Sequence, residues 1–158
     1  MKQGWYKVTN VSDLSTGDQI VIASSEEDYA MSTTESDIDT RESVAITKGS
    51  DSLGDTITWA EDANVQIIEL KAGSTSNSYG LYTGSGGYLY AIEGTSDDDY
   101  GIGTKTALDA SSSWTISFTD GNAIITSQVN SEYNVLDYDT YKNYGHIKRY
   151  TGFIFRRR

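Results

Sequence analysis

The strongest constraint on the fold is a pattern that occurs three times: an apolar strand, a short polar turn, and a tyrosine that opens a second strand. The copies read QIVIASSEEDYAMSTT, YGLYTGSGGYLYAIEG and AIITSQVNSEYNVLDYD, at residues 19–34, 79–94 and 123–139. Period-two alternation on both sides of a short turn predicts a β-hairpin. The sequence therefore predicts three related hairpins.

The glycine cluster GSGG at residues 84–87 occupies the place of the polar turns EED and NSE in the other two copies. A phosphate-binding loop requires a following helix, and its best-known form also carries a lysine. Here the alternating segment YLYAI follows instead. We interpret the glycines as the turn of a hairpin.

Each hairpin is followed by a polar loop (residues 35–42 in the first unit), a third strand and a closing strand, which gives units at about 18–72, 76–120 and 121–158. Additional strands are expected at 5–8 and 57–60. No segment keeps a 3.6-residue period for the length that an α-helix requires. We therefore predict a single all-β domain over residues 1–158, built as a β-trefoil-like closed barrel of three four-stranded units. A two-sheet β-sandwich is the alternative.

Two aromatic residues are predicted to anchor the core. Trp114 opens the closing strand of the second unit, and Tyr88 opens a hairpin arm at the repeated tyrosine position. Strands with this alternation bury every second side chain. Both rings are therefore expected inside the barrel.

Charge and composition argue against several classes of function. The 158 residues carry a formal net charge of −11, and such an acidic field repels nucleic-acid phosphates and anionic membrane surfaces. The chain has no cysteine, so disulfides and thiolate chemistry are excluded. No apolar run approaches the roughly 20 residues that a membrane-spanning helix needs. We expect neither nucleic-acid binding nor membrane insertion.

The sequence lacks a recognisable catalytic set. His146 is the only histidine, and neither a G-x-S-x-G nor an H-E-x-x-H motif occurs. Acidic residues at 37–42 and 97–99 could place two carboxylates as in a glycosidase, or could offer oxygens to Ca²⁺. These runs are typical of solvated loops, and no D-x-D-x-D-G loop is present. We predict no catalytic residue, no metal site and no cofactor, with Ca²⁺ as a minor alternative.

Binding chemistry is concentrated in YDTYKNYG, residues 138–145. Tyrosine rings offer flat stacking faces, while Asp and Asn side chains form hydrogen bonds with sugar hydroxyls. A weaker version, DDDYG, occurs in the second unit. The alternative is that these tyrosines cover the ends of the barrel. The predicted ligand-binding residues are Tyr138, Asp139, Tyr141, Asn143, Tyr144 and His146, with Tyr100 and Asp99 as a second site.

Short motifs along nearly the whole chain resemble a module appended to secreted proteins of gut-type bacteria. They are G-W-Y-K-V-T, S-D-L-x-x-G-D-x-I-V-I-A, D-Y-A-M-S-T-T, Arg41, V-Q-I-I-E-L, G-Y-L-Y-A, S-S-W-T-I and F-I-F-R. Such modules accompany surface-attachment, immunoglobulin-like, lamin-tail or hydrolase domains. The chain departs from them at LDYDTYKNYGHIKRY, where they carry a Tyr-Asn pair and an F-x-x-Y stretch. The resemblance implies an extracellular accessory module within a larger multidomain protein.

From these features we expect a non-catalytic, carbohydrate-binding module of an extracellular or cell-surface protein, with a glycan or a protein as its ligand. The alternative is a structural or adhesion domain that mediates protein–protein contact or decorates a cell or phage surface. A small hydrolase acting through Asp98 or Asp99 is a third hypothesis.

Overall fold

The computed structural model describes residues 4–36, 40–84, 86–92, 101–129, 135–138, 143–147 and 152–157. These residues form fifteen strands, all paired antiparallel, with no α-helix among them. The strands are β1 (Trp5–Val8), β2 (Gln19–Ser24), β3 (Tyr29–Ser36), β4 (Thr40–Ala45), β5 (Thr47–Asp51), β6 (Gly54–Thr58), β7 (Ile68–Ala72), β8 (Tyr79–Tyr82), β9 (Tyr88–Ile92), β10 (Gly101–Lys105), β11 (Ser113–Thr119), β12 (Asn122–Ser127), β13 (Val135–Tyr138), β14 (Asn143–Ile147) and β15 (Gly152–Arg157). Two 3₁₀ turns, η1 (Val11–Asp13) and η3 (Ala110–Ser112), complete the described structure. The all-β prediction is confirmed.

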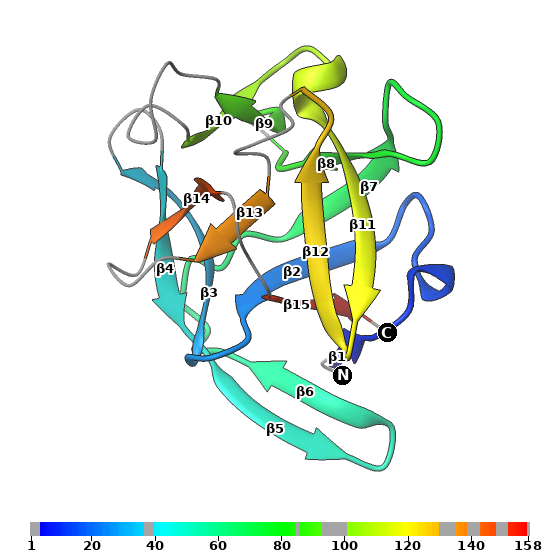
Figure 1. Cartoon of the computed structure of the whole chain (residues 1–158). Coiled ribbons are helices and arrows are strands. Elements are labelled where there is room, and N and C mark those ends of the chain that lie inside the picture. Colours follow the sequence, from blue (N-terminus) through cyan, green and yellow to red (C-terminus); the bar gives the residue numbers. More distant parts are fainter. Residues whose placement is uncertain are drawn as a thin grey trace.

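Six strands are linked in a cycle of hydrogen-bonded pairs. The pairings run β2–β7, β7–β8, β8–β11, β11–β12, β12–β15 and β15–β2. These are the first and last strands of the three units expected from the sequence. The second and third strands of each unit form the hairpins β3–β4, β9–β10 and β13–β14. The hairpins adjoin one another, because β4 pairs with β14 and β10 contacts both of these strands (Figure 1).

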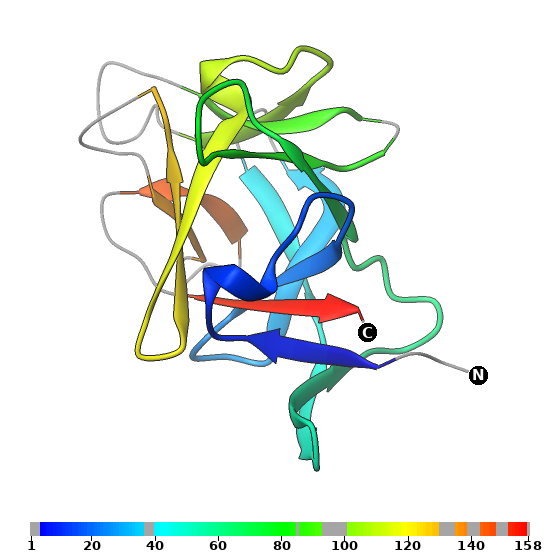
Figure 2. The same cartoon turned by 90° about the vertical axis from the view of Figure 1, so that its right-hand side faces the viewer.

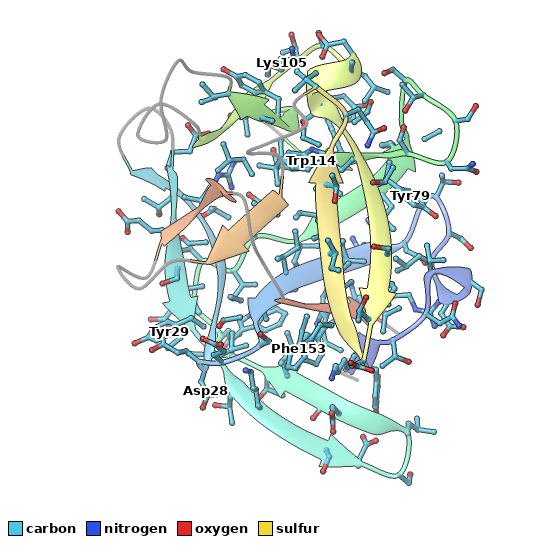
Figure 3. The ribbon with its side chains drawn as sticks, viewed as in Figure 1. Asp28, Tyr29, Tyr79, Lys105, Trp114 and Phe153 are labelled. Carbon is cyan, nitrogen blue, oxygen red and sulfur yellow. The ribbon has the colours of Figure 1, made fainter. Side chains whose placement is uncertain are left out.

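The main core is built from the inward-facing residues of the six linked strands and of the hairpins. Leu89 and Ala91 of β9 are buried in it, between outward-facing tyrosines of the same strand. Trp114 has 0% of its surface exposed, and its indole Nε1 donates to the backbone oxygen of Leu89 at 3.1 Å. Figure 3 places Trp114 in the interior of the molecule. The prediction that Trp114 anchors the core is confirmed.

Tyr88 does not belong to this core. Its side chain is only partly buried and lies on the opposite side of β9 from Leu89. The prediction for Tyr88 was wrong because the repeated tyrosine position indicates where the second strand begins but not which face its first residue takes. In β9 the inward positions are taken by Leu89 and Ala91, which alternate with the tyrosines.

A second hydrophobic cluster covers the outer face of β2, β15 and β1. Val21 and Ala23 of β2 belong to it, whereas Ile20 and Ile22 face the main core. Burial on both sides explains why β2 reads as a continuous apolar run. The hairpin β5–β6 lies over this outer face, supplies the buried Ile57, and projects from the body of the molecule (Figure 1).

Two segments differ from the expectations. A single short strand was expected at 57–60, but the structure has a complete hairpin over 47–58, whose second strand pairs with β1. The polar stretch 35–42 was expected to be a loop, yet β3 extends to Ser36 and β4 begins at Thr40. Polar residues can sit in these strands because pairing with a partner strand satisfies the backbone regardless of side-chain character. The expected strand at 5–8 is β1, and Figure 2 shows it beside β15.

Candidate functional site

Three partly exposed tyrosines gather on the outer side of β8 and β9; we call Tyr82, Tyr88 and Tyr90 the tyrosine face. Tyr82 and Tyr88 are directly opposite each other in the β8–β9 ladder, and their ring centroids lie 5.2 Å apart at 55°. Tyr90 follows two residues after Tyr88 and so points to the same side of the strand. Period-two alternation in YLYAI thus puts the rings outside and the aliphatic residues in the core.

Two glycines let these rings lie close to the backbone. A Cβ atom at Gly80 would come within 2.9 Å of the Tyr88 ring, and one at Gly103 would come within 2.9 Å of the Tyr90 ring. Gly103 is the cross-strand partner of Tyr90. The rings therefore cover Gly80 and Gly103. Both glycines are buried although they lie on the outer face of their strands.

Two lysines flank the tyrosine face. The Lys71 ammonium lies 5.4 Å from the centroid of Tyr82, and the Lys105 ammonium lies 5.0 Å from that of Tyr90. Such distances allow a cation–π attraction. Glu69, 3.0 Å from the Lys71 ammonium, raises the pKa of that lysine by hydrogen bonding and by charge. Tyr88 and Tyr82 raise it further.

Lys105 is held by Asp109 at 2.7 Å, and Figure 3 shows Lys105 at the end of the molecule that carries η3. Hydrogen bonds from Lys105 and Ser111 lower the pKa of Asp109 to about 2. The same carboxylate caps η3 by accepting from the Ser111 backbone N–H at 3.0 Å. This anchors the β10–η3 connection beside the tyrosine face.

The tyrosine face carries chemical groups that suit ligand recognition. It offers aromatic rings for stacking, two ammonium donors, and the carboxylate acceptors of Glu69 and Asp109. Sugars present both apolar C–H faces and hydroxyls, so rings with neighbouring charged groups match them. The described residues of this face include no Ser–His or Cys–His pair of the kind used for nucleophilic catalysis.

A buried ionic network lies where the first and second hairpins meet. Arg41 of β4 is 3% exposed and donates to the Ser32 backbone oxygen at 3.2 Å and to Gln66 Oε1 at 2.6 Å. Its guanidinium lies 3.5 Å from Glu35, which accepts from Thr104 Oγ1 of β10 at 2.6 Å. Burial lowers the pKa of Arg41, while Glu35 opposes this. Arg41 thus organises the first unit from inside, and Glu35 carries the hydrogen bond to the second unit through Thr104.

The ligand-binding residues predicted from the sequence fall on two strands and on segments outside the described residues. Tyr138 ends β13 and is the register partner of Tyr144 in β14, so their backbones lie opposite each other. His146 is paired with Leu136, and Asn143 is paired with Glu42 of β4. The side chains of these four predicted residues are not among those described. Asp139, Tyr141, Tyr100 and Asp99 lie wholly outside the described residues.

The tyrosine face was missed because Tyr88 was assigned to the core. One signal in the sequence could have revealed it: Tyr88 and Tyr90 alternate with Leu89 and Ala91, so either pair could face the solvent. Aliphatic side chains take the interior when the alternatives carry a hydroxyl that requires a partner or water. Applied to β9, that rule places the tyrosines outside.

Within the described ranges, no three His, Asp or Glu side chains are grouped as a metal site would need. The described part of the chain also has no helix whose length and apolarity would let it span a bilayer. Comparisons with protein-family models, with curated proteins and with solved structures found no match for this chain.

Proposed function

We propose that this chain is a non-catalytic carbohydrate-binding module of an extracellular or cell-surface protein. The observation that carries the proposal is the tyrosine face: three partly exposed rings on adjacent strands, of which Tyr88 and Tyr90 lie over glycines, with lysine–carboxylate pairs on either side. A sugar ring stacks on such tyrosines while its hydroxyls pair with the flanking charges. Membership in a larger secreted protein is supported by the resemblance of the sequence to accessory modules of gut-type bacteria.

The architecture proposed with this function is a β-trefoil. Its support is the cycle of pairings from β2 through β7, β8, β11, β12 and β15 back to β2, with one hairpin following the first strand of each unit. In that arrangement the tyrosine face belongs to the second unit. The main binding site predicted from the sequence, at 138–146, belongs to the third unit, and we propose it as a further binding region of the same module.

The direct test is affinity electrophoresis through a panel of soluble neutral polysaccharides. We expect retardation by at least one polymer, with loss of retardation in a Tyr82→Ala/Tyr90→Ala variant. Each stacked ring contributes about 1 kcal/mol, so removing two weakens binding by roughly 30-fold. The matched control is Tyr82→Phe/Tyr90→Phe, which keeps both rings and is expected to keep most of the retardation.

The region at 138–146 that the sequence predicts as the main binding site is tested in the same gels with Tyr141→Ala/Tyr144→Ala. If only this variant abolishes retardation, the binding site is the one predicted from the sequence and not the tyrosine face. If all folded variants migrate like the native chain on every polymer, carbohydrate binding is wrong. Thermal unfolding of each variant checks that loss of binding is not loss of fold.

A structural or adhesion domain is the second candidate, and the hairpin β5–β6 favours it. Leu53 at its tip is 60% exposed, and β5 pairs only with β6 among the described strands. An exposed apolar residue on a projecting arm with a free strand edge can dock on another protein. A partner captured by the native chain but not by Leu53→Ser would support this candidate, together with an absence of polysaccharide binding.

A further inference from the structure

A hollow of about 310 Å³ lies between the hairpin β5–β6 and the strands β1 and β15. Its apolar floor is Phe153, which packs edge-on against the buried Phe155 with centroids 6.1 Å apart. Figure 3 shows Phe153 on the side of the molecule that faces the hairpin. Small-molecule sites occupy about 300–1,000 Å³, so this hollow suits a ligand of a single ring.

Two lysines lie over the same phenyl ring, which is notable in a chain of net charge −11. The ammonium of Lys7 is 3.8 Å from the ring centroid of Phe153, and that of Lys48 is 5.3 Å from it. Lys48 is already satisfied: it donates to the backbone oxygens of Ser24 at 2.8 Å and Glu27 at 2.9 Å. Burial lowers the pKa of Lys48, Asp28 at 3.8 Å opposes this, and the charge of Lys7 lowers it further.

Lys7 differs from Lys48 in having no hydrogen-bond acceptor among the described residues. Its ammonium keeps three donors available at the edge of an aromatic floor. A ligand carboxylate there would form charge-assisted hydrogen bonds with Lys7 and would relieve the repulsion between the two lysines.

The opposite wall of the hollow is polar and held in place. Ser50, Asp55 and Thr56 line it from β5 and β6. The hairpin is fixed against β1 by Tyr6, whose hydroxyl donates to Asp51 at 2.7 Å. Asp55 can only accept hydrogen bonds, so it matches a ligand that carries hydroxyl donors as well as an anionic group.

We propose that this hollow binds a single hexuronic acid residue, with the carboxylate on Lys7, the sugar ring against Phe153 and the hydroxyls on the Ser50–Asp55–Thr56 wall. Sulfate satisfies Lys7 but has no O–H group to donate to Asp55, and neither sulfate nor inorganic phosphate offers an apolar face to Phe153. This site is separate from the tyrosine face. The proposals for the two sites can be supported or overturned independently, because the tyrosine face is tested with neutral glycans.

The structural alternative is that the two lysines only shield the exposed edge of Phe153 from water. Long lysine stems cover apolar surface in this way while the charge stays hydrated. Under that alternative the hollow has no preference for a carboxylated sugar over a neutral one. The choice of ligands in the test separates these readings.

The test is an NMR titration of the ¹⁵N-labelled full chain with D-glucuronate, D-glucose and acetate, each to about 50 mM, a range that detects the weak binding of a single residue. We expect glucuronate to shift the backbone amides of Lys7, Ser50 and Thr56, with glucose and acetate binding at least about tenfold more weakly. Lys7→Gln is expected to weaken glucuronate binding about tenfold or more, as loss of a charged hydrogen bond does. Lys7→Arg should retain most of the affinity.

Arg157→Gln is the charge-matched control, because Arg157 is exposed, bonds to Gln19 and does not line this hollow. It should bind glucuronate within about twofold of the native chain. The proposal is overturned if no glucuronate shift occurs, if glucose or acetate binds equally well, or if Lys7→Gln binds as the native chain does. It is also overturned if the shifts map to Tyr82, Tyr88 and Tyr90. The same spectra verify that each variant is folded.

Discussion

Gly87 and Gly84 show how single residues set the turn that the glycine cluster forms. Both have positive φ, +94° and +95°, in the region that disfavours residues with a Cβ atom. The backbone N–H of Gly87 donates to the Gly84 oxygen at 3.2 Å, and its own oxygen accepts from Thr83 at 2.8 Å. A Cβ at Gly84 would meet open space, whereas one at Gly87 would overlap the backbone oxygen of Lys105.

We therefore expect Gly84→Ala and Gly87→Ala to differ in their effect on the free energy of unfolding. Gly84→Ala carries only the conformational cost of positive φ, about 1–2 kcal/mol. Gly87→Ala adds a collision with the backbone of β10 and should cost clearly more. Urea denaturation measures both. Equal losses would mean that the turn is not packed against β10 as described.

The second prediction at the residue scale concerns the contribution of Trp114 to stability. Its ring is fully buried and its indole N–H is bonded to Leu89. Trp114→Ala should cost about 3–5 kcal/mol, a large part of the roughly 5–15 kcal/mol that stabilises a small domain. Trp114→Phe keeps a ring but loses the hydrogen bond from the indole to the Leu89 oxygen, and it should lose less stability than Trp114→Ala. A higher melting temperature for Trp114→Ala than for Trp114→Phe would contradict this account.

At the scale of the elements, the β10–η3 connection depends on one carboxylate. Asp109 forms a capping box with Ser112 and an ion pair with Lys105 four residues earlier. Its pKa is lowered to about 2, so the folded state binds its proton less readily than the unfolded chain. Its stabilising contribution is therefore present at pH values above its ordinary pKa of 3.8 and is lost as the pH falls through about 2.

We expect Asp109→Asn to reduce the dependence of unfolding free energy on pH between about 5 and 2, because asparagine still caps the turn but does not titrate. Asp109→Ala should remove both the cap and the pH dependence, and should be the less stable of the two at pH 7. The native chain and both variants are compared by thermal unfolding across this range. The effect is modest, since the side chain is exposed. An unchanged slope in Asp109→Asn would assign the acid sensitivity to other carboxylates.

For the molecule as a whole, the three adjacent strands β1, β15 and β2 join the two hydrophobic clusters. Ile154 of β15 faces the main core, while Phe155, the next residue, faces the outer cluster under the hairpin β5–β6. Trp5 and Trp59 stack in the outer cluster with centroids 5.4 Å apart, and Trp114 lies in the main core. The tryptophans thus report on the two clusters separately.

We expect the two clusters to unfold in a single transition. A chain with only Trp114 (Trp5→Phe/Trp59→Phe) and a chain without it (Trp114→Phe) should each show fluorescence midpoints that coincide with the midpoint by circular dichroism. The reason is that β15 and β2 contribute alternate side chains to both clusters, so neither can be lost alone. A separate, earlier transition of the Trp5–Trp59 signal would show that the hairpin β5–β6 unfolds independently.

The sequence alone determined the strand character of the chain, the strand pairs β2–β3, β8–β9 and β12–β13 on either side of the polar turns, and the burial of Trp114. These features follow from local signals: alternation over four to eight residues and glycines at turns. The hairpins β3–β4, β9–β10 and β13–β14 were not predicted as pairs. The outer cluster was not foreseen, because an apolar run such as that of β2 indicates burial on both faces without naming what covers the second face. The second face of β2 is covered by the hairpin β5–β6, and the polar residues of this hairpin gave no indication of its position in the fold.

The candidate sites were decided by tertiary structure for the same physical reason. The tyrosine face requires knowing which side of β9 points inward, and a shift of one residue in register would reverse it. The hollow at Phe153 brings together Lys7 from the start of the chain, Ser50 from the hairpin and Phe153 from the last strand. Such a group has no spacing that a sequence pattern can display. Local periodicity determines which residues form strands, but only the packing of distant strands determines which side chains share a surface.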